Sequence, residues 1–294
     1  MSLITIGMPV FNDVRFINET LNSLLCQTFS DFILIISDDG STDGSGDICQ
    51  NFAEKDKRIK YIKQPATIGI SRNMSFLLSQ ATTEYFMWAA DDDLYAPDFI
   101  EKLIGLLKTS VNAISAFCSF AIIDDNGNIK SRKEDYDYSN NNSIKRLKYF
   151  IKNSNDKFGY GIFVLEKIKK VKFPIWWWPN KNCPLNNIFP SLCFYLVKGD
   201  YAHYYGNPLF FKREKSKVSS NYNTPYSTNG IKDTFAFILR RLYLVFFSSK
   251  MIYKGGGMKL SLFFFPMLFI YWFCVPSLKQ INLLLKSLKT KFKA

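Results

Sequence analysis

Apolar residues in the first part of the chain follow two different periods. Short runs rich in Ile, Val and Phe occupy residues 2–10, 31–37, 58–64 and 84–90, and such runs predict buried β-strands. The segments between them carry apolar residues three or four positions apart, which predicts amphipathic helices. Because strand and helix alternate along the chain, the sequence predicts a doubly wound, mostly parallel α/β sheet with helices on both faces.

Polar residues gather where each predicted strand ends. Ligands bind at the carboxyl ends of the strands in such sheets, so these residues are expected at one site. After the four strands come, in order, Pro9, Phe11, Asn12 and Asp13; Asp38, Asp39, Gly40 and Ser41; Gly69, Arg72 and Asn73; and Asp91, Asp92 and Asp93. Simpler interpretations exist for some of them taken singly: residues 37–45 as a polar turn with a helix cap, Arg72 as a solvated helix residue, and Phe11 as a core aromatic.

The aspartate triplet 91–93 is harder to explain by structure alone. Adjacent carboxylates that follow an apolar strand repel one another unless a cation compensates them. Hard divalent cations prefer oxygen ligands. We therefore predict a site for Mn²⁺ or Mg²⁺ at this triplet.

The C-terminal part of the chain has a different composition. The formal net charge is +13, and residues 231–294 carry eleven Lys and Arg against the single acid Asp233. Nineteen uncharged residues lie between Lys259 and Lys279, interrupted by Pro266. Because the aromatics form unbroken blocks instead of alternating with basic residues, we expect an anionic membrane surface and no nucleic acid as the partner. A span, a re-entrant segment, an interfacial helix and a hairpin packed on the protein's own core all fit the pattern.

The cysteines favour a reducing compartment. None of them forms a CxxC pair and no secretory signal precedes them, so we expect free thiols and no zinc site.

Four segments in a fixed order carry a family resemblance. They are "ITIGMPVFND", "QTFSDFILIISDDGSTDGS", "GISRN" and "EYFMWAADDDLYAPDFIEKL". Across residues 3–105 their order and spacing resemble glycosyltransferase family 2, whose members are inverting enzymes of the GT-A fold, a Rossmann-like α/β architecture, and use nucleotide-diphosphate sugars.

The resemblance assigns roles to individual residues. It implies that Phe11 stacks on the nucleobase, that Asp39 accepts the uracil N–H, and that Arg72 approaches the diphosphate. It also implies that Asp92 ligates Mn²⁺ or Mg²⁺, with Asp91 nearer the ribose or the sugar. The nucleotide-sugar site implied in this way comprises Pro9, Phe11, Asn12, Asp39, Gly69, Arg72, Asn73 and Asp91.

The aspartate motif departs from the family's pattern. The first Asp of the familiar Asp-x-Asp-Asp motif falls on Ala90, which leaves open which two aspartates bind the metal. We predict Asp92 and Asp93. Some members place a metal-binding His after a later strand, where this chain has Glu214 and Lys215, so that segment lacks the His that serves those members as a ligand.

The general base of an inverting transfer is missing from its usual place. The family carries an acidic residue in the window that reads Asn186, Asn187 and Ile188 here, and an Asn cannot take a proton from the acceptor hydroxyl. Either the base comes from elsewhere, with Asp93, Glu166 and Asp200 as candidates, or the chain is a non-catalytic relative that binds nucleotide sugars or acts as a scaffold. The single histidine, His203, is interpreted as structural.

Three adjacent tryptophans, Trp176, Trp177 and Trp178, are flanked by prolines. They suit either an acceptor site, where Trp stacks on a sugar, or a packed corner clamped by the prolines.

These inferences define an expected organisation. Residues 1–220 are expected to form the GT-A domain, with a nucleotide-sugar-binding half at 1–110 and an acceptor-binding half at 111–220, followed by the membrane-associating region 231–294. The expected function is the transfer of a hexose or N-acetylhexosamine from a UDP-sugar to a lipid-linked or polysaccharide acceptor, in O-antigen or capsule synthesis. The expected place is the cytoplasmic face of a membrane, as a peripheral or monotopic protein.

Overall fold

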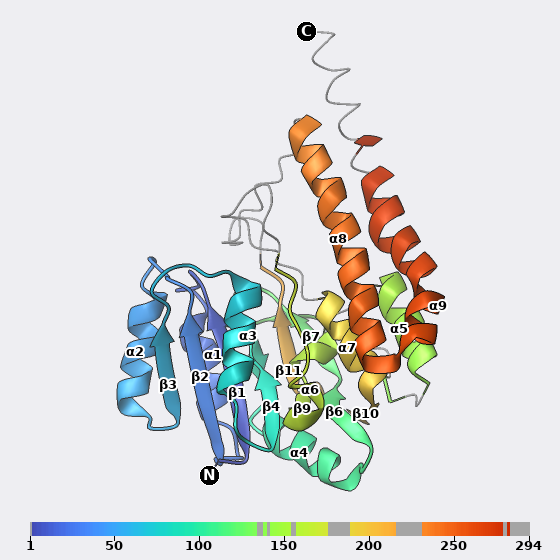
Figure 1. Ribbon diagram of the computed structural model, residues 1–294. Coiled ribbons are helices and arrows are strands. Elements are labelled where there is room, and N and C mark those ends of the chain that lie inside the picture. Colours follow the sequence, from blue (N-terminus) through green and yellow to red (C-terminus); the bar gives the residue numbers. More distant parts are fainter. Residues whose placement is uncertain are drawn as a thin grey trace. The chain divides into compact units, whose positions relative to one another are not determined.

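A computed structural model describes residues 2–133, 138–139, 142–153, 157–175, 189–215, 231–278 and 281–282 (Figure 1). The chain forms two compact units. The first draws on residues up to 141, 156–170 and 199–221, and the second on residues 142–155, 171–198 and 222–294. The domain limits expected from the sequence stay a prediction.

A seven-stranded sheet forms the centre of the first unit. Its strand order is β10-β6-β9-β4-β1-β2-β3. All neighbours pair in parallel except β9, which is antiparallel to both β4 and β6. The predicted mostly parallel α/β sheet is therefore confirmed. The strands are β1 (Ile4–Val10), β2 (Phe32–Asp38), β3 (Ile59–Lys63), β4 (Tyr85–Trp88), β6 (Ala113–Cys118), β9 (Ile162–Val164) and β10 (Asp200–Tyr204).

Helices cover both faces of this sheet, as predicted. On one face α3 packs on β1 and β2. A Cβ atom added to Gly7 would lie 2.8 Å from the Phe86 ring and 3.4 Å from Leu77 of α3, so glycine permits this close contact. Ile6 of the same strand points to the opposite face and is fully buried there. The helices are α1 (Ile17–Leu25), α2 (Ser45–Lys55), α3 (Ile70–Gln80) and α4 (Phe99–Thr109), with the short α6 (Leu165–Ile168) and the 3-10 turn η1 (Lys157–Tyr160).

A second, four-stranded sheet in the same unit supports the aspartate segment. Its order is β5-β11-β7-β8, where β11 is antiparallel to β5 and parallel to β7. Strand β5 begins directly after the aspartate triplet, so β11 lies beside that segment. The strands are β5 (Leu94–Tyr95), β7 (Phe120–Ile123), β8 (Ile129–Lys133) and β11 (Phe210–Arg213).

The described part of the second unit is helical. It contains α5 (Ser143–Asn153), α7 (Phe189–Lys198), α8 (Ile231–Gly256), α9 (Met258–Leu268) and a π-helical segment η2 (Phe269–Cys274). The hydroxyls of Ser249 and Ser261 join α8 to α9 at 2.7 Å. Trp272 donates its indole N–H to the Ile151 carbonyl of α5 over 3.0 Å. These hydrogen bonds hold the apolar C-terminal helices together.

The C-terminal helical run is long and apolar enough to cross a membrane. By length and composition, one such helix occurs among the described residues, Met258–Leu278, with a mean hydropathy of 1.8 over its most apolar window. Only 22% of that window is buried within the protein. Most of its apolar surface is therefore not used for packing inside the chain, unlike that of a core helix.

Candidate functional site

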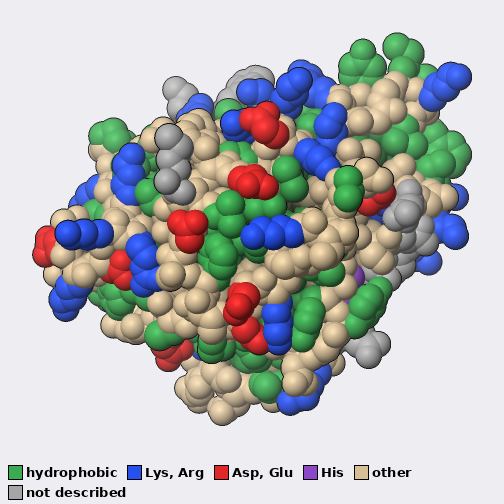
Figure 2. All heavy atoms as spheres, turned by 90° about the horizontal axis from the view of Figure 1, so that it is seen from below, with side chains coloured by type: hydrophobic (Ala, Val, Ile, Leu, Met, Phe, Trp, Pro, Cys, Tyr) green, Lys and Arg blue, Asp and Glu red, His purple; other side chains and the backbone are tan. Residues whose placement is uncertain are grey.

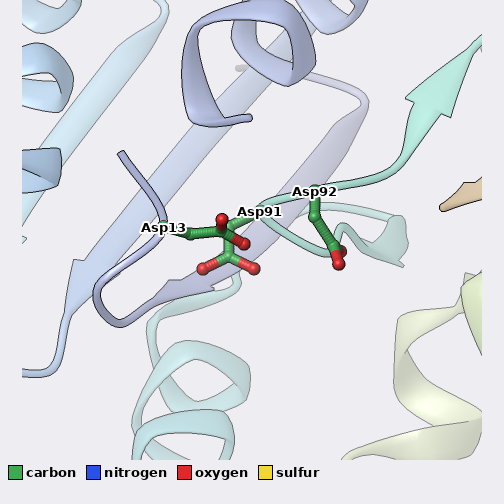
Figure 3. Close-up of side chains that lie close together, drawn as sticks. All are labelled: Asp13, Asp91 and Asp92. Atoms are coloured by element: carbon green, nitrogen blue, oxygen red, sulfur yellow. The ribbon is translucent and has the colours of Figure 1, made fainter. Parts of the chain in front are cut away.

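Three carboxylates meet at the carboxyl ends of two neighbouring parallel strands. Asp13 follows β1, while Asp91 and Asp92 follow β4, which pairs with β1. Their ligand oxygens all lie within 4.8 Å of one another (Figure 3). We call these three residues the carboxylate cluster. It lies at the sheet edge where the sequence predicts a ligand site.

The loop after β1 holds Asp13 through contacts with the segment after β2. The backbone N–H of Asp13 donates to Ser45 Oγ over 2.8 Å, and that of Asn12 donates to Ser41 Oγ over 3.0 Å. The Asn12 side chain accepts the Thr42 N–H at 2.8 Å. Asn12 has φ 52°, a left-handed conformation that Asn tolerates better than most residues. The polar segment after β2 therefore serves to fix Asp13 and is more than a turn.

The two aspartates at the end of β2 shape the neighbouring loops. Asp38 accepts the Tyr61 hydroxyl at 2.8 Å. Asp39 accepts the N–H groups of Ile68 and Gly69 at 2.7 and 2.9 Å. Burial raises the pKa of Asp39 above its ordinary value. Asp39 thus fixes the turn that begins α3, and its predicted contact with uracil stays a prediction.

The structure places the other predicted nucleotide-sugar residues on β1 and α3 or directly beside them. Phe11 is half-buried, and its N–H donates to Asp91 Oδ2 over 3.3 Å, which joins the β1 loop to the cluster. Pro9 is half-buried in β1. Asn73 is buried in α3 and donates to the Ser37 carbonyl over 2.9 Å. Arg72 is exposed on the first turn of α3, where its guanidinium is accessible to a ligand. Gly69 precedes α3 with φ 84°.

A lysine reaches into the cluster from the segment after β11. Lys215 Nζ contacts Asp13 Oδ2 and lies 3.0 Å from Asp92 Oδ2. These carboxylates raise the pKa of Lys215 despite the opposing effect of burial, so its ammonium is charged. The sequence identified Lys215 as a replacement for a possible metal-binding His but gave no sign that its side chain reaches the aspartates.

Burial and mutual repulsion favour protonation in the cluster. Burial is the main cause that raises the pKa of Asp13 to about 6, against the lowering effect of Lys215. Burial, and then the charges of Asp92 and Asp13, raise the pKa of Asp91 well above its ordinary value. The donor set consists of oxygens only and carries excess negative charge, so it fits Mn²⁺ or Mg²⁺.

Asp93 lies apart from the cluster. It is fully buried and accepts the Arg213 backbone N–H at 2.8 Å and Lys212 Nζ at 3.3 Å. Burial raises its pKa to about 7. As a result, the third carboxylate of the cluster comes from Asp13, although the sequence favoured Asp93. Its burial also argues against Asp93 as a base that reaches an acceptor.

Arg213 fixes the backbone of the aspartate segment. Its buried guanidinium donates to the carbonyls of Asp92, Asp124 and Asp125 at 2.8, 3.0 and 2.8 Å. It also pairs with Glu19 of α1 at 2.7 Å. Sequence reasoning missed this residue, because nothing in a single Arg at the end of a strand signals which distant carbonyls it binds.

The remaining candidates for the base lie at the other edge of the sheet. Asp200 begins β10, and Glu166 follows β9, whose last residue Val164 pairs with Tyr85 at the start of β4. Both positions therefore lie at the amino ends of the parallel strands, opposite the cluster. Glu166 is paired with Lys169 at 2.7 Å.

The last predicted residues are His203 and the three tryptophans. The His203 ring packs between aromatic rings, with its centroid 4.8 Å from that of Tyr205 and 6.5 Å from that of Phe117, which agrees with a structural interpretation. Trp176, Trp177 and Trp178, like the window 186–188, lie outside the described residues.

Comparison with known proteins identifies the family. Residues 5–171, more than half of the chain, match the family model for glycosyl transferase family 2. The chain belongs to glycosyltransferase family 2. An uncharacterized glycosyltransferase of Haemophilus influenzae is 35% identical over 141 residues, 46% of this chain and 56% of that protein. Glycosyltransferase GlyA of Streptococcus pneumoniae is 35% identical over 100 residues, 34% of this chain and 14% of that protein. The chain thus spans about half, or less, of these curated relatives.

Solved structures of glycosyltransferases share the fold. Staphylococcus aureus TarS (residues 1–349), crystallised with UDP-GlcNAc, has a TM-score of 0.59 and 14% identity, covering 86% of this chain and 71% of TarS. The mannosyltransferase PcManGT of Pyrobaculum calidifontis, in complex with GDP-Man and Mn²⁺, has a TM-score of 0.55 and 15% identity, covering 99% of this chain and 75% of its own. These likenesses confirm the GT-A fold predicted for this member of family 2.

The role of Arg213 predicts a large loss of stability in Arg213→Met. The substitution removes three hydrogen bonds to carbonyls of half-buried residues, and each such bond contributes about 0.5–1.5 kcal/mol. We expect the free energy of unfolding to fall by about 2–4 kcal/mol in urea titrations. Arg15→Met is the matched control, since Arg15 also contacts Asp125 and Phe16 but is 55% exposed. An equal loss in both variants would contradict the role given to Arg213.

The raised pKa of Asp13 predicts that Mn²⁺ affinity depends on pH. A metal binds the ionised carboxylate, so below a pKa of about 6 it must displace a proton. Affinity is therefore expected to be highest above that pH and to fall as the pH decreases through 6. Calorimetric titration with Mn²⁺ between pH 5 and 7.5 measures this, with Asp13→Asn as the variant in which the dependence should become weaker, leaving the part that is due to Asp91. Equal affinity of the unaltered chain across that interval would contradict the prediction.

Proposed function

We propose that this member of family 2 transfers a hexose or N-acetylhexosamine from a UDP-sugar to a lipid-linked or polysaccharide acceptor, with inversion at the anomeric carbon. The observation that carries the proposal is the carboxylate cluster of Asp13, Asp91 and Asp92 at the carboxyl ends of β1 and β4. Ligands bind at this edge in doubly wound sheets. TarS, a structural neighbour, is known in complex with UDP-GlcNAc, which supports a UDP-sugar as the donor.

The donor would lie along the loops that surround the cluster. Phe11 offers an aromatic face for the base, Asp39 a carboxylate for the uracil N–H, and Arg72 an exposed guanidinium for the diphosphate. Asp91 and Asp92, with Asp13, would hold Mn²⁺ or Mg²⁺. When bound, such a cation offsets the negative charge that develops on the departing diphosphate.

The transfer itself is a substitution at the anomeric carbon. The acceptor hydroxyl oxygen forms a bond to this carbon as the bond to the β-phosphate oxygen breaks, and UDP leaves. The hydroxyl proton passes to a general base. Two observations argue against the three candidates for this base. Asp93 is buried, and Glu166 and Asp200 lie at the amino ends of the parallel strands, opposite the cluster.

A non-catalytic relative is the second candidate. It would keep the donor site and bind nucleotide sugars, or act as a scaffold, without transfer. The sequence of the window Asn186, Asn187 and Ile188 favours it, because no carboxylate stands there to take the proton.

The acceptor is proposed to be presented at the cytoplasmic face of a membrane. The apolar helix Met258–Leu278, little buried within the protein, supports association with lipid. Lys259 at the start of this helix and Lys279 just after it in the sequence would favour anionic headgroups. Figure 2 shows one face of the molecule, on which basic and acidic side chains are interspersed.

Calorimetric titration with UDP tests the donor site. We expect UDP binding to strengthen with Mn²⁺ in the unaltered chain and to lose this dependence in Asp92→Ala, because the variant removes a ligand of the cation. Asp31→Ala is the matched control, since Asp31 is exposed just before β2, at the opposite edge of the sheet. Failure to bind UDP under any condition would overturn the proposal.

Release of UDP from a panel of UDP-sugars then separates the two candidates. The enzyme should release UDP from one sugar, faster when lipid-linked acceptors are added. Binding of UDP and metal without release from any sugar, with or without acceptors, would favour the non-catalytic relative.

Sedimentation with vesicles tests the membrane contact. Leu262 and Val275 are 67% and 55% exposed, so replacing both by Glu should weaken binding to phosphatidylglycerol vesicles at least tenfold, since each buried apolar side chain contributes about 1.5 kcal/mol or more. Val111→Glu is the control, because Val111 is 90% exposed but belongs to the first unit. Unchanged sedimentation of the double variant would contradict membrane association through this helix.

A further inference from the structure

The carboxylate cluster already contains a cation that belongs to the chain. Lys215 Nζ contacts Asp13 Oδ2 and is 3.0 Å from Asp92 Oδ2, so one ammonium bridges two of the three carboxylates. The third, Asp91, is close enough that its charge also favours the charged form of this lysine. The ammonium therefore occupies the place in which a divalent cation would find its oxygen ligands.

The backbone delivers this ammonium from a fixed position. The adjacent residue Glu214 donates its N–H to the Ile123 carbonyl of β7 over 2.9 Å. Arg213 donates its N–H to Asp93 and its guanidinium to the Asp92 carbonyl, both at 2.8 Å. Because these contacts anchor the preceding backbone on both the strand and the aspartate segment, the Lys215 side chain can leave the cluster without displacing that backbone.

Charge and geometry make the ammonium and a metal mutually exclusive. An ammonium donates hydrogen bonds to the lone pairs with which a carboxylate binds a metal, so both cannot use the same oxygens. Removal of the ammonium without replacement would leave three carboxylates within 4.8 Å and no counter-charge. A divalent cation supplies more charge than the ammonium, and it can take over the same oxygens.

We infer that Lys215 is a built-in competitor of the divalent cation: its ammonium fills the carboxylate cluster when no metal is bound and must withdraw before Mn²⁺ or Mg²⁺ binds. This inference rests on the proposed donor site. It makes Lys215 a residue that sets the metal concentration at which the site loads. The apparent metal affinity equals the intrinsic affinity multiplied by the fraction of time for which the cluster is free of the ammonium. If the ammonium fills the cluster for nine-tenths of the time, metal binding is therefore weakened about tenfold.

Titration of Mn²⁺ without nucleotide, followed by the paramagnetic resonance of the free ion, tests the inference directly. Lys215→Met removes the ammonium and should bind Mn²⁺ at least tenfold more tightly than the unaltered chain. Lys215→Gln, a polar neutral variant, should do the same and serves if the Met variant fails to fold. Lys215→Arg keeps a positive charge that can pair with the same carboxylates and should not bind Mn²⁺ more tightly than the unaltered chain.

A matched control separates competition from net charge. Lys130→Met also removes one positive charge, next to the same segment, because Lys130 pairs with Glu214 at 3.5 Å and is 48% exposed. It should leave Mn²⁺ affinity unchanged. As a second readout, Mn²⁺ should raise the melting temperature of Lys215→Met and Lys215→Gln more than that of the unaltered chain, since tighter binding stabilises the native state more.

Unchanged or weaker Mn²⁺ binding in both neutral variants would overturn the inference, and so would an equal gain in Lys130→Met. Calorimetry with UDP on the same samples keeps the two proposals distinguishable. If UDP binding depends on metal but the Lys215 variants bind Mn²⁺ with unchanged affinity, the proposed donor site stands and only the role of Lys215 as a competitor is rejected. Absence of both UDP and Mn²⁺ binding in every chain overturns the donor site and the competitor with it.

Discussion

Mutual repulsion of three carboxylates is the constraint around which the site is built. Parallel pairing of β1 and β4 brings Asp13, Asp91 and Asp92 within 4.8 Å. At that separation, each ionised pair repels by roughly 3 kcal/mol when the effective dielectric constant is near 20. The fold tolerates this arrangement only because hydrogen bonds to the surrounding loops fix the backbone, and because the charge is compensated.

Protons, the Lys215 ammonium and a divalent cation are three ways to compensate the same charge. The pKa of Asp13, raised to about 6 by burial, indicates partial protonation at mildly acidic pH. The ammonium compensates part of the remainder through Asp13 and Asp92. A metal would replace both. The cluster is thus best understood as a set of competing cation equilibria, which explains why acidic residues alone do not define its metal affinity.

The sequence predicted the architecture well because local patterns determine it. Alternation of apolar runs and helical periods was enough for the parallel sheet, and the motifs ending in Asp91 and Asp92 were enough for the family. The choice between Asp13 and Asp93 was not predictable from adjacency. The chain bends at Asp91 and Asp92 before β5 begins, so strand alternation does not apply there: Asp93, next to β5, turns toward β11 and leaves the cluster to Asp91 and Asp92.

Strand β11 supplies what the sequence could not reveal. Its basic residues lie far along the chain from the aspartates, yet each contacts a different part of that segment: Lys212 the Asp93 carboxylate, Arg213 the Asp92 carbonyl, and Lys215, just past the strand, the Asp92 carboxylate. The first two are structural contacts with buried groups, whereas only the third faces the ligand oxygens. One short basic segment therefore separates two tasks. It holds the aspartate backbone rigid, and it leaves a single flexible side chain to exchange with an incoming cation.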